Sequence, residues 1–364
     1  MLALLPHAWH DWVNQQSTLI LLVIVVVATA AVIKGADWIV DAAATLARRL
    51  GLPQVVIGAT IVSLGTTSPE AAVSVMAAWA GESGIALGNG VGSIIVDSGL
   101  ILGLGLLLTR VPANAYILNR QGWVQFGSGA LLCAICYGLF LLQGDAATIS
   151  RAIGLLLVTL LVVYMAVSVH WSRSLQGAAL PAAAAPEPEQ EQDADAPART
   201  LAPLLLLGVL GLAIVVVGSD ALVGSASELA LRWGVPSVVL AATLVAFGTS
   251  MPELVVGLTA IRRGHGELML GNIIGADILN VLFVVGAAAL AQPLPVVDFD
   301  AATGAQWRHL LLQLHLPVML SLLVLLRVFT TVALKRGHFP RWMGVPLLVA
   351  YVAYVAVQLI TVGR

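Results

Sequence analysis

The chain has 364 residues and a formal net charge of −2, and only 10% of its residues are Asp, Glu, Lys or Arg. Hydrophobic residues make up 59% of it, and its mean hydropathy is +0.98. Soluble domains hold roughly 25% charged and 45–50% apolar residues, so most of this chain cannot face water. The composition predicts a protein that crosses a lipid bilayer several times. With no basic surface to bind nucleic acid, the bilayer is its expected partner, and no obligatory protein partner is evident.

Apolar runs of about 20 residues, separated by charged or Gly/Pro-rich breaks, mark the expected membrane spans. Backbone that faces lipid must form its hydrogen bonds internally, so these spans should be helices. The N-terminal stretch has no basic residues ahead of its apolar run, which favours a retained first helix over a cleaved signal. We predict ten helices, near residues 17–41, 53–80, 84–109, 122–142, 149–170, 202–231, 236–262, 267–291, 309–333 and 341–361.

Basic residues in the connecting loops divide unequally between the two sides of the membrane. The richer side is normally cytoplasmic, and this places both termini outside. Without a targeting segment, we expect a plasma membrane or a bacterial inner membrane. The cytoplasmic set is Arg48, Arg49, Arg110, Arg120, Arg173, Arg199, Arg262, Arg263, Lys335, Arg336 and Arg341, against Arg151, Arg232, Arg308 and Arg364 outside.

Residues 172–200 form a polar stretch rich in Ala and Pro, with acidic residues at its centre. It lacks the Gly and the ligand order of a calcium-binding loop, and its composition is typical of a flexible, solvated linker. We predict a cytoplasmic linker that joins two halves, 1–171 and 201–364, with five helices in each.

The two halves are related by a constant offset of 183 residues. Aligning 35–103 with 218–286 without a gap gives 27 identities in 69 positions. Random pairing in so apolar a composition would give roughly a quarter of that number. The matches include Gly, Pro, Glu and Asn, so they are not a shared apolar background. Because five is an odd number of spans, the second half should be inverted relative to the first.

The predicted fold is therefore an all-α membrane protein of ten transmembrane helices, arranged as two inverted five-helix repeats. The most similar segments of the halves, 51–108 and 234–291, should carry the ion-binding motifs. Inverted repeats with interrupted helices are typical of secondary transporters, which bind substrate near the bilayer midplane at the repeat interface.

Each half contains a proline within its second span, in GATIVSLGTTSPEAAVSV and in AATLVAFGTSMPELVVGL. Pro69 and Pro252 lack an amide hydrogen, so each should free the carbonyl four residues earlier, that of Gly65 or Gly248. Hydroxyl groups stand directly beside each expected kink: Thr66, Thr67, Thr249 and Ser250.

A carboxylate follows each of these prolines, Glu70 in the first half and Glu253 in the second. A charged group in hydrocarbon costs roughly 2–3 kcal/mol or more unless it faces a cavity or a partner. Two carboxylates at equivalent positions would also repel each other unless a cation lay between them. Carboxylates, freed carbonyls and hydroxyls together predict a site for a hard cation such as Ca²⁺ or Na⁺.

The third spans, GNGVGSIIVDSG and GNIIGADILNVL, add further polar groups. Ser93 and Asp97 share a helix face at i, i+4, and Asp277 and Asn280 share one at i, i+3. The repeat counterpart of Asp277 is Ile94, so Asp277 fits a packing role nearly as well as an ion-binding one. The asparagines of the two GN motifs favour bracing or capping of helices.

At these residues the sequence resembles the calcium:cation antiporter superfamily, close to the prokaryotic sodium/calcium exchangers. GTTSPE (65–70) and GTSMPE (248–253) look like the family's GTSxPE signature, and the two GNxxG segments look like its partner motif. The resemblance covers both repeats and nearly the whole chain. It implies a transporter rather than an enzyme, without a cofactor, that extrudes Ca²⁺ in exchange for Na⁺ by alternating access to one central site.

The resemblance also assigns residues. It implies that Glu70 and Glu253 are the central calcium ligands, with hydroxyl or carbonyl oxygens from Thr66, Thr67, Thr249 and Ser250. It further implies that Ser93, Asp97 and Asn280 line the sodium positions. The first and sixth spans, with Gly35 and Gly218 at equivalent points, would slide across the site.

Three departures from the family pattern leave the coupling ion open. Ile94 stands where the family usually has Asn, Ala276 replaces the equivalent of Ser93, and Asp277 is an added acid. The alternative is a Ca²⁺/H⁺ antiporter whose carboxylates carry protons. A passive channel is disfavoured because paired acids suit a binding site better than a pore. An intramembrane hydrolase would need a catalytic His or Ser/Lys arrangement, and none is evident in the sequence.

Overall fold

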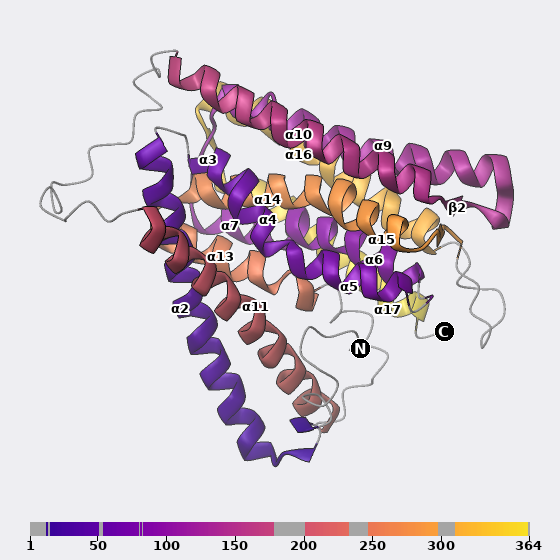
Figure 1. Ribbon diagram of the computed structural model, residues 1–364, viewed down its shortest axis with the longest axis horizontal. Helices are drawn as coiled ribbons and strands as arrows, with labels where there is room; N and C mark the ends of the chain where they lie inside the picture. The colour runs from indigo at the N-terminus through magenta and orange to yellow at the C-terminus, as the bar shows by residue number, and fades with distance from the viewer. Residues whose placement is uncertain are drawn as a thin grey trace, which may run out of the picture.

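The structure is a computed structural model that describes residues 12–13, 15–50, 54–79, 81, 83–177, 201–232, 247–297 and 310–362. Its described residues are mostly helical (Figure 1). Eight helical segments among them are long and apolar enough to cross a membrane. They are α2 (Thr18–Leu50), α6–η2–α7 (Ser83–Ile95, Val96–Ile101, Leu102–Leu108), α9 (Gln121–Gln143), α10 (Arg151–Gly177), α11 (Leu201–Arg232), α14–η4–α15 (Gly266–Leu279, Asn280–Val285, Gly286–Ala291), η5–α16 (Leu311–His315, Leu316–Arg336) and α17 (Gly344–Val362).

Two of these helices run further than the apolar runs predict. Helix α2 continues past residue 41 to Leu50, and Arg48 and Arg49 lie on its last turn instead of in a loop. The added segment is rich in Ala, Leu and Arg, which all favour helix. Helix α10 likewise continues to Gly177, so the first residues of the expected linker are helical. Residues 178–200 lie outside the described part.

The second span of each half is broken rather than kinked. In the first half, α3 (Gln54–Ile57), η1 (Gly58–Val62) and α4 (Ser63–Thr66) are followed by a turn at Thr67 and then by α5 (Ser68–Trp79). In the second half, a turn at Ser250 precedes α13 (Met251–Arg262), and residues 233–246 of the expected span lie outside the described part. Each proline therefore stands in the first turn of a new helix, where its missing N–H removes no hydrogen bond.

Two short antiparallel sheets join the halves at opposite ends of α9. Strand β1 (Val111–Pro112) pairs with β4 (His338–Phe339), and β2 (Thr148–Ile149) pairs with β3 (Leu294–Pro295). The remaining short elements are α8 (Ala115–Leu118), η3 (Gly144–Ala146) and η6 (Arg341–Met343). With 1.5 Å per residue, α9 separates the two sheets by about 35 Å. Each sheet takes one strand from each half, so the two halves are joined at both ends of α9.

Equivalent helices of the two halves run in opposite directions. Figure 1 shows α2 and α11 together on one side, and an ideal Cβ on Gly35 would lie 2.8 Å from the carbonyl oxygen of Gly211. Later on α11, Gly218 faces Val32, which comes earlier on α2. The third spans show the same relation: Gly90 faces Val285, whereas Gly105 faces Met269. Their π-helical segments, η2 and η4, fall at matching places in the two halves.

An ionic contact ties α2 to the end of α13. Arg262 donates to Asp37 at 2.6 Å, and Arg263 donates to Asp37 at 3.1 Å and also to Asp41. Asp37 is therefore engaged in ion pairs near the surface rather than in the buried polar centre. The contact connects a helix of the first half with one of the second.

Helix α14 passes through the centre of the molecule because glycines let it touch the broken span. Every residue from Leu268 to Leu279 is buried. A Cβ on Gly275 would lie 2.5 Å from the carbonyl oxygen of Ala59, and a Cβ on Gly58 would lie 2.5 Å from that of Leu268. The backbones of α14 and η1 are thus in direct contact, which places the polar groups of the two elements side by side.

We predict that Gly275→Ala lowers the unfolding free energy by about 1–3 kcal/mol, because the added methyl group meets backbone that cannot move aside. The measurement is the Tm of the purified protein in detergent. Gly127→Ala is the matched control, since Gly127 lies on a helix with nothing within 4 Å of its Cβ position. Equal Tm values for the two variants would contradict this packing.

Candidate functional site

Four acidic side chains meet in the interior between the two halves. Glu70 lies in the first turn of α5, Glu253 in the first turn of α13, Asp97 on η2 and Asp277 on α14. None is more than 1% exposed. Glu70 is close enough for its charge to interact with those of Glu253 and Asp97, and Asp97 interacts with Asp277. The structure thus brings together acids that lie up to 207 residues apart in the chain.

The breaks in the second spans place two helix N-termini at this cluster. Glu70 follows the turn at Thr67, and Glu253 follows the turn at Ser250. The N-terminus of a helix carries a partial positive charge that stabilises a nearby carboxylate. Both glutamates therefore gain some compensation from the backbone, although this falls short of a full counter-charge.

Threonine and asparagine side chains connect the two halves by equivalent hydrogen bonds. The Thr66 hydroxyl donates to Asn272 Oδ1 at 3.3 Å, and the Thr249 hydroxyl donates to Asn89 Oδ1 at 2.9 Å. Thr66 and Thr249 are 183 residues apart, and so are Asn89 and Asn272. One interaction thus occurs twice, each time between a second span and the third span of the other half.

Two further contacts hold the glutamates in place. The Thr67 hydroxyl donates to Glu253 Oε1 at 3.2 Å, across the interface between the halves. Asn89 Nδ2 donates to the backbone carbonyl of Glu70 at 3.2 Å and to the Ser74 hydroxyl at 3.0 Å. Asn89 therefore braces α5 and α6 and reaches the second half through Thr249.

A group of buried side-chain oxygens remains without a hydrogen-bond partner of ordinary geometry. One of them, the Ser250 hydroxyl, is near enough to Asp97 to interact with it. Each unpaired buried polar group costs about 1–3 kcal/mol, and a charged one costs more. The group comprises Glu70 Oε2, Glu253 Oε2, both carboxylate oxygens of Asp97, Asp277 Oδ1, Asn280 Oδ1, Ser93 Oγ and Ser250 Oγ.

Such an all-oxygen group suits a hard cation. No cluster of three or more His, Cys, Asp or Glu side chains arranged to hold a metal ion occurs in the described ranges. A cation held here would therefore have to combine carboxylates with hydroxyl, amide or backbone oxygens.

Asp277 differs from the other three acids because two neighbouring side chains hold it by hydrogen bonds. Its Oδ2 accepts hydrogen bonds from the Ser98 hydroxyl and from Gln125 Nε2, both at 2.6 Å. Sequence reasoning missed Ser98 and Gln125. Gln125 lies on α9, outside the repeated motifs. In the sequence it stands out only as an amide side chain within an apolar helix.

The two glycines predicted to supply freed carbonyls lie against α11. A Cβ on Gly65 would be 2.8 Å from Leu212, and one on Gly248 would be 3.1 Å from Val223. Both positions are half-buried. Because glycine has no side chain, α11 can approach both helix breaks closely.

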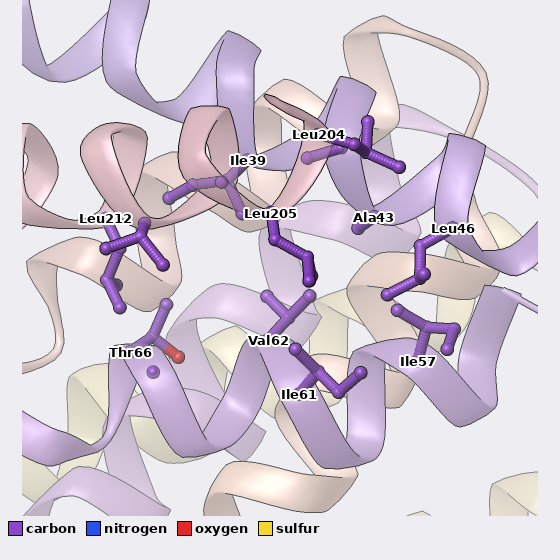
Figure 2. A pocket seen from close by; sticks show the side chains of 14 residues that line it. Ile39, Ala43, Leu46, Ile57, Ile61, Val62, Thr66, Leu204, Leu205 and Leu212 are labelled. Carbon is purple, nitrogen blue, oxygen red and sulfur yellow. The ribbon is translucent and has the colours of Figure 1, made fainter. Parts of the chain in front are cut away.

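An apolar cavity of about 120 Å³ adjoins the polar cluster, between α2, α11 and the first broken span. Figure 2 shows Ile39 and Leu46 of α2, Leu205 and Leu212 of α11, and Thr66 with its hydroxyl at the edge. The α2–α11 pair is therefore separated from part of the broken span by unfilled space rather than by tight packing.

Comparison with known proteins agrees with this arrangement. The sequence profile of the sodium/calcium exchanger protein family matches residues 20–170 and 203–360. The chain belongs to this family. The family resemblance that the GTSxPE-like motifs predict is thereby confirmed.

Several relatives of known name or structure are similar over most of their length. The chain is 32% identical over 345 residues to sodium/calcium exchanger MaX1 of Methanosarcina acetivorans, covering 90% of this chain and 95% of the relative. It is 31% identical to inner membrane protein YrbG of Escherichia coli, covering 72% and 77%. The solved structure of the sodium/calcium exchanger from Methanococcus jannaschii superimposes with a TM-score of 0.74 at 25% identity, covering 93% and 99%.

We predict that Asp277→Leu destabilises the protein by about 1–3 kcal/mol, whereas Asp277→Asn is close to neutral. The asparagine carbonyl oxygen can still accept from Ser98 and Gln125, but leucine leaves both buried donors without an acceptor. Thermal unfolding of the two variants in detergent measures the difference. Equal destabilisation by both substitutions would show that the charge, and not the pair of hydrogen bonds, fixes this residue.

Proposed function

We propose that this protein exchanges Ca²⁺ for Na⁺ across the membrane by alternating access to one carboxylate site between its halves. The observation that carries the proposal is the meeting of Glu70 and Glu253. They occupy equivalent positions of the two halves, are 1% exposed, and each keeps one carboxylate oxygen unpaired. Membership of the exchanger family and the similarity to the named sodium/calcium exchangers support it.

The proposed architecture is ten helices in two inverted repeats, residues 1–171 and 201–364, joined by a cytoplasmic linker at 172–200. The opposite directions of α2 and α11, and of the two third spans, support the inversion. The strands give independent support: β1 and β3 are 183 residues apart in sequence, yet they belong to sheets at opposite ends of α9. The loop charges favour both termini outside. The name of the Escherichia coli relative, inner membrane protein YrbG, supports an inner membrane location.

In the proposed calcium-bound state, the two glutamates balance the charge of one Ca²⁺. Hydroxyl or carbonyl oxygens from the two helix breaks, at Thr66, Thr67, Thr249 and Ser250, would complete the six to eight oxygen ligands that Ca²⁺ takes. Gly65 and Gly248 remain candidates for carbonyl ligands. Burial of the site makes the mutual repulsion of the glutamates strong whenever no cation is present, because the local dielectric constant is low.

The sodium positions are proposed at the third spans. Ser93, Asp97 and Asn280 are buried and present unpaired oxygens, and Asp97 is close enough to interact with both glutamates. Ala276 supplies no hydroxyl at the position equivalent to Ser93, which makes the second half poorer in sodium ligands than the first. The additional charge of Asp97 allows more than one monovalent cation to replace each Ca²⁺. Asp277, with one free oxygen, lies next to this group.

Proton coupling is the second candidate function. The observation in its favour is the number of acids: Asp97 and Asp277 lie beside the two glutamates, so four carboxylates share one buried region. In this alternative, the same carboxylates would bind either Ca²⁺ or protons.

The movement that exposes the site to one side or the other is assigned to α2 and α11. These helices pack closely on each other through Gly35, Gly211 and Gly218, whereas a cavity separates them from part of the broken span. A pair held together in this way can shift as one body. Ions bias the shift only through different affinities for the two states, so an empty, repelling site disfavours closure and prevents leak.

We predict that Glu70→Gln and Glu253→Gln each reduce ⁴⁵Ca²⁺ uptake into proteoliposomes to background. Either substitution removes half of the negative charge that balances Ca²⁺ while keeping the shape of the side chain. Glu267→Gln is the matched control, because Glu267 lies at the start of α14, about 15 Å from Asp277 along the helix. Uptake by either site variant at the level of the control would refute the ligand assignment.

We predict that an outward Na⁺ gradient drives ⁴⁵Ca²⁺ uptake and that a protonophore leaves this uptake unchanged. The same vesicles are tested with an outward H⁺ gradient in place of the Na⁺ gradient. Uptake driven by protons alone would transfer the protein to the proton-coupled alternative. In that case Asp277→Asn, which keeps the hydrogen bonds of Asp277, tests whether this acid carries a proton.

A further inference from the structure

The apolar cavity beside the polar cluster is elongated along the helices that surround it. Its lining comes from α2 over residues 39–46, from α11 over 204–212, and from the first broken span over 57–66. On α2 the lining residues are spaced i, i+3, i+4 and i+7, so they form a single stripe along the helix. At 1.5 Å per residue, the lining extends about 10–12 Å parallel to α2 and α11.

The described lining offers a water molecule no free polar side chain. Thr66 carries the one polar side chain among these residues, and its buried hydroxyl donates to Asn272 Oδ1 at 3.3 Å. A buried water needs two to four polar partners, whereas an apolar cavity of similar size stays dry and takes up apolar molecules. The lining atoms therefore lack contact partners on the cavity side unless an apolar molecule fills the space.

The mouth of the cavity lies on the lipid-facing surface. Ile61 of the broken span is 52% exposed, and Leu205 and Val209 of α11 are 50% and 62% exposed. Figure 2 shows Leu205 facing Val62, which lies deeper and is buried. Both α2 and α11 are long and apolar enough to cross the membrane. The mouth is thus continuous with the surface that these helices present to the acyl chains of the bilayer.

We propose that an acyl chain of a bilayer phospholipid binds in this cavity, with its methyl end beside Thr66. Acyl chains and membrane-spanning helices both lie along the bilayer normal, so a chain can enter through the mouth without leaving the membrane. Filling the cavity gives its lining the dispersion contacts that an empty space lacks.

The arginines at the end of α2 indicate which leaflet supplies the chain. Figure 2 shows Leu46, Ile57 and Leu204 at one end of the cavity and Thr66 at the other. Leu46 lies just before Arg48 and Arg49, which we expect at the cytoplasmic face. The chain therefore comes from the cytoplasmic leaflet. Its binding is independent of the exchange reaction and of the ion that drives it.

The test uses the full-length protein in vesicles of phosphatidylcholine, part of which carries a photoreactive diazirine at the end of one acyl chain. After irradiation, mass spectrometry of the digested protein identifies the labelled residues. Val27 of α2 is 62% exposed and faces the surrounding lipid, so its label is the internal standard. Val62 and Thr66 are buried, and the chain reaches them only through the cavity.

We expect label on Val62 and Thr66 in the wild-type protein and its loss in Ala43→Phe, whose phenyl ring occupies the space of the chain. Ala43 is buried and lines the cavity. Ala30→Phe is the matched control, since it makes the same change at an exposed position of the same helix. This control should keep the wild-type label on both residues.

Label on Val27 without label on Val62 and Thr66 in the wild-type protein would overturn the proposal, and this result needs no variant that folds. Equal labelling of the two buried residues in Ala43→Phe and Ala30→Phe would also overturn it, because the chain would then reach them by another path. The labelling requires no ion gradient, so its outcome is separate from that of the uptake experiments.

Discussion

The burial of two like charges is the constraint on which the rest of the structure depends. Glu70 and Glu253 lie together in the interior, where their repulsion is hardly screened. The chain accommodates them by ending a helix just before each one, so that two N-termini face the pair, and by directing neutral oxygens towards the same place. Under the proposed function, a bound cation would balance these charges and occupy the unpaired oxygens.

The connections around these acids make the halves mutually dependent. Each half contributes the hydroxyl of one Thr–Asn bond and the amide of the other, so neither polar layer is complete alone. Glycine contacts between η1 and α14 bring the backbones together at the same level. The polar centre is thereby held by rigid, glycine-lined crossings, whereas the α2–α11 pair meets it across an apolar cavity. Close backbone packing at the acids and unfilled space beside them thus occur in one region.

The sequence was sufficient to predict a membrane protein of the exchanger family and to single out the four acids that the structure brings together, because motifs and spacing carry that information. The offset that aligns the two GTxxPE-like motifs also pairs the asparagines that the structure joins to the threonines. It was not sufficient to predict that the prolines begin new helices, since this depends on where the preceding turn closes. Gln125 was missed for a related reason: its partner Asp277 is 152 residues away, and no local pattern joins them.

The ionic contact between α13 and α2 distinguishes the two halves. Two identical inverted halves would face either side of the membrane with equal ease. Arg262 and Arg263 have Trp79 and Ala80 as their repeat counterparts, so the positions equivalent to these two arginines carry no positive charge in the first half. A partly exposed ion pair contributes up to about 1 kcal/mol to the conformation in which it forms. The two halves are therefore chemically unequal where α13 meets α2, although most of their polar centre is built from equivalent residues.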